Sequence, residues 1–170
     1  IQQKELKLQK ILQYTTDTFC RIGLTEHETF QIRECVEYLV KNEKVLSLPD
    51  LKIERRPEIT QISLKNFAWN IAYQYKLPGQ LAAQFVMTTF HEWFADSTLY
   101  TVVKNLKTTS GNHAIPIDTH ILKKYYPQYT FIVTITLLYS QERFFIVAYP
   151  REREFSSYVF IRVKLYRVIE

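Results

Sequence analysis

The stretch from Ser63 to Phe94 reads SLKNFAWNIAYQYKLPGQLAAQFVMTTFHEWF, and its organisation decides how the chain can fold. In both halves apolar residues recur at intervals of three and four, which is the spacing of one face of a helix. They are Leu64, Phe67, Ala68, Ile71, Ala72 and Tyr75 in the first half, and Leu81, Phe85, Val86, Phe90 and Trp93 in the second. Between them stands Lys76-Leu77-Pro78-Gly79, where proline disfavours helix before it and glycine permits a turn. The stretch predicts two helices joined by a tight turn, as in a helix-turn-helix.

In a helix-turn-helix the second helix enters the major groove of DNA. Here the second helix has a polar stripe made of Gln80, Gln84, Thr88, His91 and Glu92. Glutamine and threonine can read base edges, so Gln80, Gln84 and Thr88 are candidates for base contacts. The stripe has no lysine or arginine, although phosphate contacts supply most of the affinity for DNA. The phosphate contacts would instead be made by lysines of neighbouring segments, namely Lys65, Lys76, Lys104 and Lys107. The alternative is an ordinary helical hairpin whose apolar stripes fill a core.

The charge of the chain is unevenly distributed. It has 170 residues and a net charge of +5. Residues 1–62 carry ten Lys or Arg and ten Asp or Glu, so the whole excess follows Ser63. A basic surface favours polyanions, because their bound counterions are released. The alternative is that a net charge of +5 lies within the ordinary range of proteins and only helps to keep the protein soluble. With only 3 glycines in the chain, a glycine-rich phosphate loop and a doubly wound nucleotide fold are not expected.

The first 62 residues predict two helices and a connector. One helix covers Gln2 to Tyr14 and breaks at Thr15-Thr16-Asp17. The other covers Glu26 to Lys44 and begins with a capping box made by Thr25 and Glu28. Its apolar stripe consists of Phe30, Val36, Leu39 and Val40. Residues 47–63 form a connector with two prolines, which is a possible boundary between a helical piece, 1–46, and a core, 58–170.

The rest of the chain changes from helical to strand periodicity. A helix from Thr98 to Leu106, capped by Asp96 or Ser97, is followed by a short one that Asp118 caps and that ends at Tyr125. Three segments with a period of two then predict strands at Tyr129 to Tyr139, Arg143 to Tyr149 and Ser157 to Ile169. The predicted fold is α+β: a helical N-terminal two-thirds with a helix-turn-helix-like hairpin, followed by a three-stranded antiparallel β meander. We expect a single domain over residues 1–170.

The last predicted strand has one basic and aromatic face. Phe160, Arg162, Lys164 and Tyr166 alternate along it. Such a face can stack bases and neutralise phosphates, so Arg162 and Lys164 join the candidate phosphate contacts. The alternative is a sheet face that is solvated or covered by helices.

Catalytic and metal sites are not expected. There is no Gly-x-Ser-x-Gly elbow, Walker loop, His-Glu-x-x-His or Cys-x-x-Cys motif, so we expect no enzyme and no cofactor. His113, Asp118 and His120, with His91, contain metal-ligating groups. Nothing in their spacing fixes a coordination geometry, however, and a helix cap explains Asp118 better.

The compartment is inferred from the cysteines and the hydropathy. Cys20 and Cys35 are interpreted as buried thiols of a reducing compartment, with a single disulfide as the alternative. The sequence contains no run of 18 or more uncharged apolar residues, so we expect no membrane span. These features favour a cytoplasmic protein, or a nuclear one in a eukaryote.

The leading functional hypothesis is a non-enzymatic nucleic-acid-binding module, with double-stranded DNA favoured. The predicted contacts are Lys76, Gln80, Gln84, Thr88, Lys104, Lys107, Arg162 and Lys164. The alternative is a protein-interaction or assembly domain, binding a partner or itself through the helix Gln2 to Tyr14 or the aromatic strand face. Salt distinguishes the two, because it screens binding to a polyanion.

Overall fold

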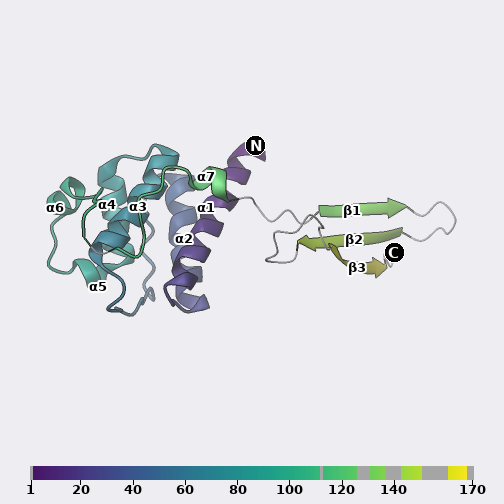
Figure 1. Ribbon diagram of the computed structural model, residues 1–170, viewed down its shortest axis with the longest axis horizontal. Helices are drawn as coiled ribbons and strands as arrows, with labels where there is room; N and C mark the ends of the chain where they lie inside the picture. The colour runs from purple at the N-terminus through teal and green to yellow at the C-terminus, as the bar shows by residue number, and fades with distance from the viewer. Residues whose placement is uncertain (1, 112, 126–130, 137–142, 151–160, 168–170) are drawn as a thin grey trace. The chain divides into compact units, whose positions relative to one another are not determined.

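The computed structural model describes residues 2–111, 113–125, 131–136, 143–150 and 161–167, and the side chains of residues 3–111 and 113–125. It divides into two compact units, residues 1–126 and 127–170. The described part of the first unit is helical, and the second contains a small sheet (Figure 1).

The described part of the first unit contains seven helices. They are α1 (Gln2–Arg21), α2 (Glu26–Asn42), α3 (Gln61–Tyr75), α4 (Gly79–Thr89), α5 (His91–Phe94), α6 (Leu99–Lys104) and α7 (Ile121–Lys124). α1 packs against α2 and α3 against α4, while α4 also contacts α6. The core is centred on Phe67, whose ring centroid lies 4.7 Å from that of Phe19 and 6.5 Å from that of Phe90, both edge to face. Such pairs add about 0.5–1.5 kcal/mol each beyond the burial of their area.

The turn between α3 and α4 is made by Lys76 and not by Gly79. Lys76 has a left-handed backbone with φ of 56°. Its N–H donates to the Tyr73 carbonyl, and the Leu77 N–H donates to the Ala72 carbonyl at 2.9 Å. This pair of bonds is a Schellman motif, which satisfies the last carbonyls of a helix. The expected turn is therefore present, but the role given to glycine was wrong, since Gly79 is the first residue of α4 and has no positive φ.

α1 continues through the predicted break at Thr15-Thr16-Asp17 and ends at Arg21. The hydroxyls of Thr15 and Thr16 donate to carbonyls four residues earlier, at 2.8 and 3.0 Å, so both threonines stay within the helix. The extension brings Phe19 into the core, where it is fully buried. The predicted break was wrong because this burial outweighs the modest helix propensity of threonine.

The capping box of α2 is confirmed and also anchors the connector. The Thr25 hydroxyl accepts from the Glu28 N–H, and Glu28 accepts from the Thr25 N–H. The same carboxylate receives two hydrogen bonds from Arg56, at 2.8 and 2.9 Å, and one from the Glu54 N–H. The connector is buried as well, at Leu51, Ile53 and Ile59. The described buried residues on both sides of the connector belong to the same hydrophobic core.

Several predicted side-chain positions are corrected by the structure. Phe30 is 57% exposed, and the core face of α2 uses Ile32 and Cys35, because those residues turn toward α1 and α4. The cap of α6 is Thr98, whose hydroxyl accepts from the Thr101 N–H, and not Asp96 or Ser97. Cys20 is exposed and only Cys35 is buried; both are free thiols.

α3 holds the loop before α7 through a row of polar side chains, Ser63, Asn66, Asn70 and Gln74, which we call the polar ladder. Ser63 Oγ accepts from the Ala114 N–H at 2.8 Å. Asn66 donates to the Ile115 carbonyl and accepts from the Thr108 N–H. Asn70 donates to the Pro116 carbonyl and the Tyr14 hydroxyl, and accepts from the Asp118 N–H at 2.8 Å. Gln74 donates to the Thr119 carbonyl. These bonds satisfy backbone N–H and carbonyl groups of the loop that would otherwise be paired in a helix or a sheet.

The described part of the second unit contains three strands, β1 (Phe131–Thr136), β2 (Arg143–Pro150) and β3 (Ile161–Arg167), in the order β1-β2-β3. Both neighbouring pairs are antiparallel, with Phe131 opposite Ala148 and Phe144 opposite Arg167. Arg162 and Lys164 lie two apart in β3, so they share a face by alternation. Their side chains, and the predicted strand ends beyond these bounds, lie outside the described residues. The α+β class and the single domain stay predictions.

Glu28 should make stability depend on pH. The Arg56 guanidinium, with help from the Thr25 and Glu54 bonds, lowers the pKa of Glu28 from 4.5 to about 2, although burial opposes this. A lowered pKa contributes stability that is full above about pH 4.5 and is lost as the pH falls toward 2. Glu28→Gln should cost about 3 kcal/mol at pH 7, and this difference should shrink between pH 5 and 2 in urea unfolding. Glu34→Gln, on the exposed side of α2, is the control; a Glu28 effect that is constant from pH 7 to 2 would contradict the assignment.

Asn70→Ala should destabilise the first unit by about 3 kcal/mol, because it leaves the Asp118 N–H and the Pro116 carbonyl without partners. Asn42→Ala is the matched control, since Asn42 is exposed and bonds only to the Tyr38 carbonyl of its own helix. It should change the free energy of unfolding by less than about 0.5 kcal/mol. Equal effects of the two substitutions in urea unfolding would show that the polar ladder does not anchor the loop.

Candidate nucleic-acid interface

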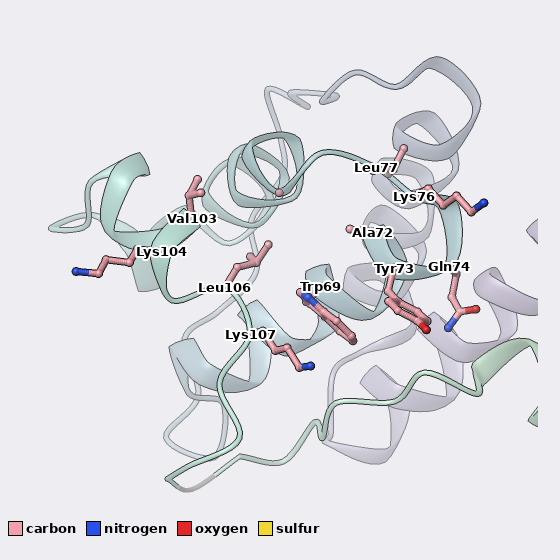
Figure 2. Close-up of a pocket in the computed structure, with 11 residues that line it drawn as sticks. Trp69, Ala72, Tyr73, Gln74, Lys76, Leu77, Val103, Lys104, Leu106 and Lys107 are labelled. Atoms are coloured by element: carbon pink, nitrogen blue, oxygen red, sulfur yellow. The ribbon is translucent and has the colours of Figure 1, made fainter.

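A groove of about 800 Å³ opens between α3, the turn after it, and α6 with the segment that follows (Figure 2). Its lining residues are Trp69, Ala72, Tyr73, Gln74, Lys76, Leu77, Gly79, Val103, Lys104, Leu106 and Lys107. We call it the lysine groove. Three lysines but no aspartate or glutamate occur among the residues that line it, so it is a positively charged concavity.

The three lysines come from three different structural positions. Lys76 is the left-handed residue that ends α3, and Lys104 is the last residue of α6. Lys107 lies in the segment after α6. All three are exposed. In Figure 2 the ammonium groups of Lys104 and Lys76 point outward from opposite ends of the groove, and Lys107 lies between them. Lys107 is held in place through its neighbour Thr108, whose N–H donates to Asn66 of the polar ladder.

A fourth lysine increases the positive charge at the Lys76 end. Lys7 of α1 donates to the Gln74 carbonyl at 2.6 Å, and its ammonium lies 4.1 Å from the centroid of the Tyr75 ring. Partial burial lowers the pKa of Lys7, and the neighbouring charge of Lys76 lowers it further. The repulsion between these two ammonium groups is relieved when an anion binds beside them.

The floor of the groove is aromatic. Trp69 and Tyr73 lie one turn apart on α3, and their rings are stacked with centroids 5.0 Å apart and planes inclined by 24°. The Lys107 ammonium lies 4.8 Å from the centroid of the Trp69 ring, within the range of a cation–π contact. Tyr73 is 52% exposed. The groove thus combines cations with an accessible aromatic surface.

The structure brings together only part of the predicted site. Lys76, Lys104 and Lys107 line one groove. Gln80, Gln84 and Thr88 lie on the solvent side of α4, opposite its buried residues, and do not line the groove. Arg162 and Lys164 belong to the second unit.

Trp69 and Tyr73 were missed by the sequence reasoning. Both fall outside the apolar stripe of α3, on a face that also carries Lys65 four residues before Trp69. Lys65, Trp69 and Tyr73 are spaced four residues apart, so they share one face of the helix outside the apolar stripe. Two large aromatic residues on such a face, next to a lysine, could have indicated a binding surface.

Three of the residues considered as metal ligands, Asp118, His113 and His120, have other hydrogen-bond partners. Asp118 forms an ion pair with Lys124 at 2.6 Å and accepts from the His120 N–H. His113 contacts the Gly111 carbonyl through Nδ1. Within the described residues, no three His, Cys, Asp or Glu side chains are grouped to hold a metal ion.

Comparisons with protein-family models, with curated proteins and with solved structures found no match. Among the described helices, none has the length and apolar character needed to cross a membrane. A functional argument therefore rests on the described residues themselves.

The two tryptophans should differ in their access to solvent. Trp93 is 4% exposed and its Nε1 donates to the Ile59 carbonyl, whereas Trp69 lies in the groove. Trp93→Phe, which leaves Trp69 as the emitter, should be quenched by acrylamide more steeply than the parent protein. Trp69→Phe should be quenched less steeply. Equal quenching of the two variants would contradict the open groove.

Proposed function

We propose that the protein is a non-enzymatic nucleic-acid-binding module, with DNA as its ligand and the lysine groove as its phosphate contact. The observation that carries the proposal is the gathering of Lys76, Lys104 and Lys107 around one groove whose lining holds no carboxylate. Three exposed cations around one concavity make a positive surface, which a polyanion binds with release of its counterions. A cytoplasmic or nuclear location belongs to the same proposal.

α4 remains the candidate for base contacts. Gln80 and Gln84 are exposed and Thr88 is partly exposed, so the stripe is available to a ligand. Gln80 directly follows Gly79, where the groove meets α4. The first turn of α4 has no side-chain cap, and its free N–H groups favour an anion there. A backbone held by Lys76 would therefore run close to the start of the stripe.

A protein-interaction surface is the second candidate. Tyr100 and Val103 lie three residues apart on α6 and are 76% and 37% exposed, so two large apolar side chains reach the surface side by side. The surface first expected on Gln2 to Tyr14 is less available, since Leu8, Ile11 and Leu12 are buried within the first unit. This candidate would use the side of α6 that carries Tyr100 and Val103, at the edge of the lysine groove, which Val103 also lines.

Substituting the groove lysines should flatten the salt dependence of DNA binding. We expect Lys76→Gln, Lys104→Gln and Lys107→Gln each to reduce the slope of log K against log salt by about 0.9 on a duplex, one phosphate contact apiece. Fluorescence anisotropy with a labelled 20-base-pair duplex between 20 and 200 mM salt measures this slope.

Lys44→Gln is the matched control, because Lys44 is exposed and lies outside the groove. It makes the same change in net charge and should leave the slope unaltered. If all four variants behave alike, binding depends on net charge and the groove is not the site. If the parent protein binds neither this duplex nor a single strand at 20 mM salt, the proposed function is wrong.

A further inference from the structure

The stacked pair Trp69–Tyr73 presents an aromatic ring at the surface of the first unit. Trp69 is partly buried and packs against the hydrophobic core, whereas Tyr73 is 52% exposed, and both residues line the lysine groove. Trp69 covers one face of Tyr73, so the exposed surface of Tyr73 lies mainly on its other face and its edge. An aromatic face beside three lysines is a surface on which a base can stack between phosphate contacts.

We propose that the lysine groove binds single-stranded DNA, with an unpaired base stacked on the free face of Tyr73. This inference rests on the proposed function and names the form of its ligand. The base would extend the Tyr73–Trp69 stack to three rings, and the cation above Trp69, Lys107, would contact a phosphate beside that base.

The arrangement of charge fits this ligand. Lys76 and Lys104 lie at opposite ends of the groove, with the aromatic pair between them (Figure 2). A strand crossing the groove would bring its backbone to both ends and its bases to the floor. The volume of about 800 Å³ falls within the roughly 300–1,000 Å³ of sites that enclose small ligands. It is suited to a short stretch of nucleotides.

A duplex uses these features less well. The faces of its bases are occupied by their neighbours in the stack, so a base cannot reach Tyr73 without leaving the helix, which is unfavourable. Gln80, Gln84 and Thr88, which are the candidates for reading a duplex, do not line the groove. A single strand can contact both features of the groove, because its phosphates can bind the lysines while an unpaired base stacks on the accessible Tyr73 ring.

The test compares three probes on the full chain: the oligonucleotide dT12, a 12-base-pair duplex, and polyphosphate of similar charge. At 50 mM salt, dT12 should bind most tightly and should quench the fluorescence of Trp69. Tyr73→Ala should weaken dT12 binding by about 5- to 150-fold, as expected for the loss of one base–aromatic stack. It should weaken polyphosphate binding less than twofold.

Tyr73→Phe and Phe30→Ala are the controls. Tyr73→Phe keeps the ring and should bind dT12 within twofold of the parent protein. Phe30→Ala removes another exposed aromatic ring, from α2 and outside the groove, and should have no effect. Thermal unfolding followed by circular dichroism confirms that each variant is folded before binding is compared.

The outcomes separate the inference from the proposed function. If Tyr73→Ala weakens all three probes equally, or weakens none, stacking is excluded while polyanion binding stands. If Tyr73→Phe loses as much affinity as Tyr73→Ala, the hydroxyl matters and not the ring, and the inference is also wrong. If none of the probes binds at 50 mM salt, the proposed function fails and the inference fails with it.

Discussion

The buried amides of Asn66 and Asn70 are the constraint on which the rest of the first unit depends. Each side chain is fully buried and bonds to backbone groups more than 40 residues away in the chain. A buried amide without partners costs several kcal/mol, so the ladder is stable only when the loop is in place. Conversely, the loop between α6 and α7 has no regular structure of its own to satisfy its N–H and carbonyl groups. Helix and loop therefore order each other.

This mutual dependence explains why α3 can serve three purposes at once. One face carries the apolar stripe around Phe67, a second carries the polar ladder, and the third presents Trp69 and Tyr73. Because the first two faces are fixed by the core and the loop, the third is held in one orientation. Lys107 is tied to the same helix through Thr108 and Asn66. A rigid aromatic floor and a cation above it suit a binding groove, since little ordering remains to be done when a ligand arrives.

The helices were largely predictable from the sequence, whereas the groove was only half predictable. The 3.6-residue period of Leu64, Phe67 and Ile71 is a local signal, and so is the capping box of Thr25 and Glu28. The persistence of α1 to Arg21 depends on the tertiary burial of Phe19, which no local pattern contains. The three lysines were chosen for their charge, but their meeting at one groove depends on how α6 packs against α4. Nothing in the spacing of Asn66 and Asn70 indicates that their backbone partners lie beyond residue 107.

The left-handed conformation of Lys76 has a further meaning for how this surface evolves. A residue with φ of 56° is one at which glycine is the least strained choice, by about 1 kcal/mol over other residues. A change to glycine would therefore make the turn easier to form and would remove a charge from the groove. Under the proposed function, stability and ligand affinity would pull in opposite directions at this one position. Glu43, which ends α2 with a similar φ of 51° and does not line the groove, is under no such second demand.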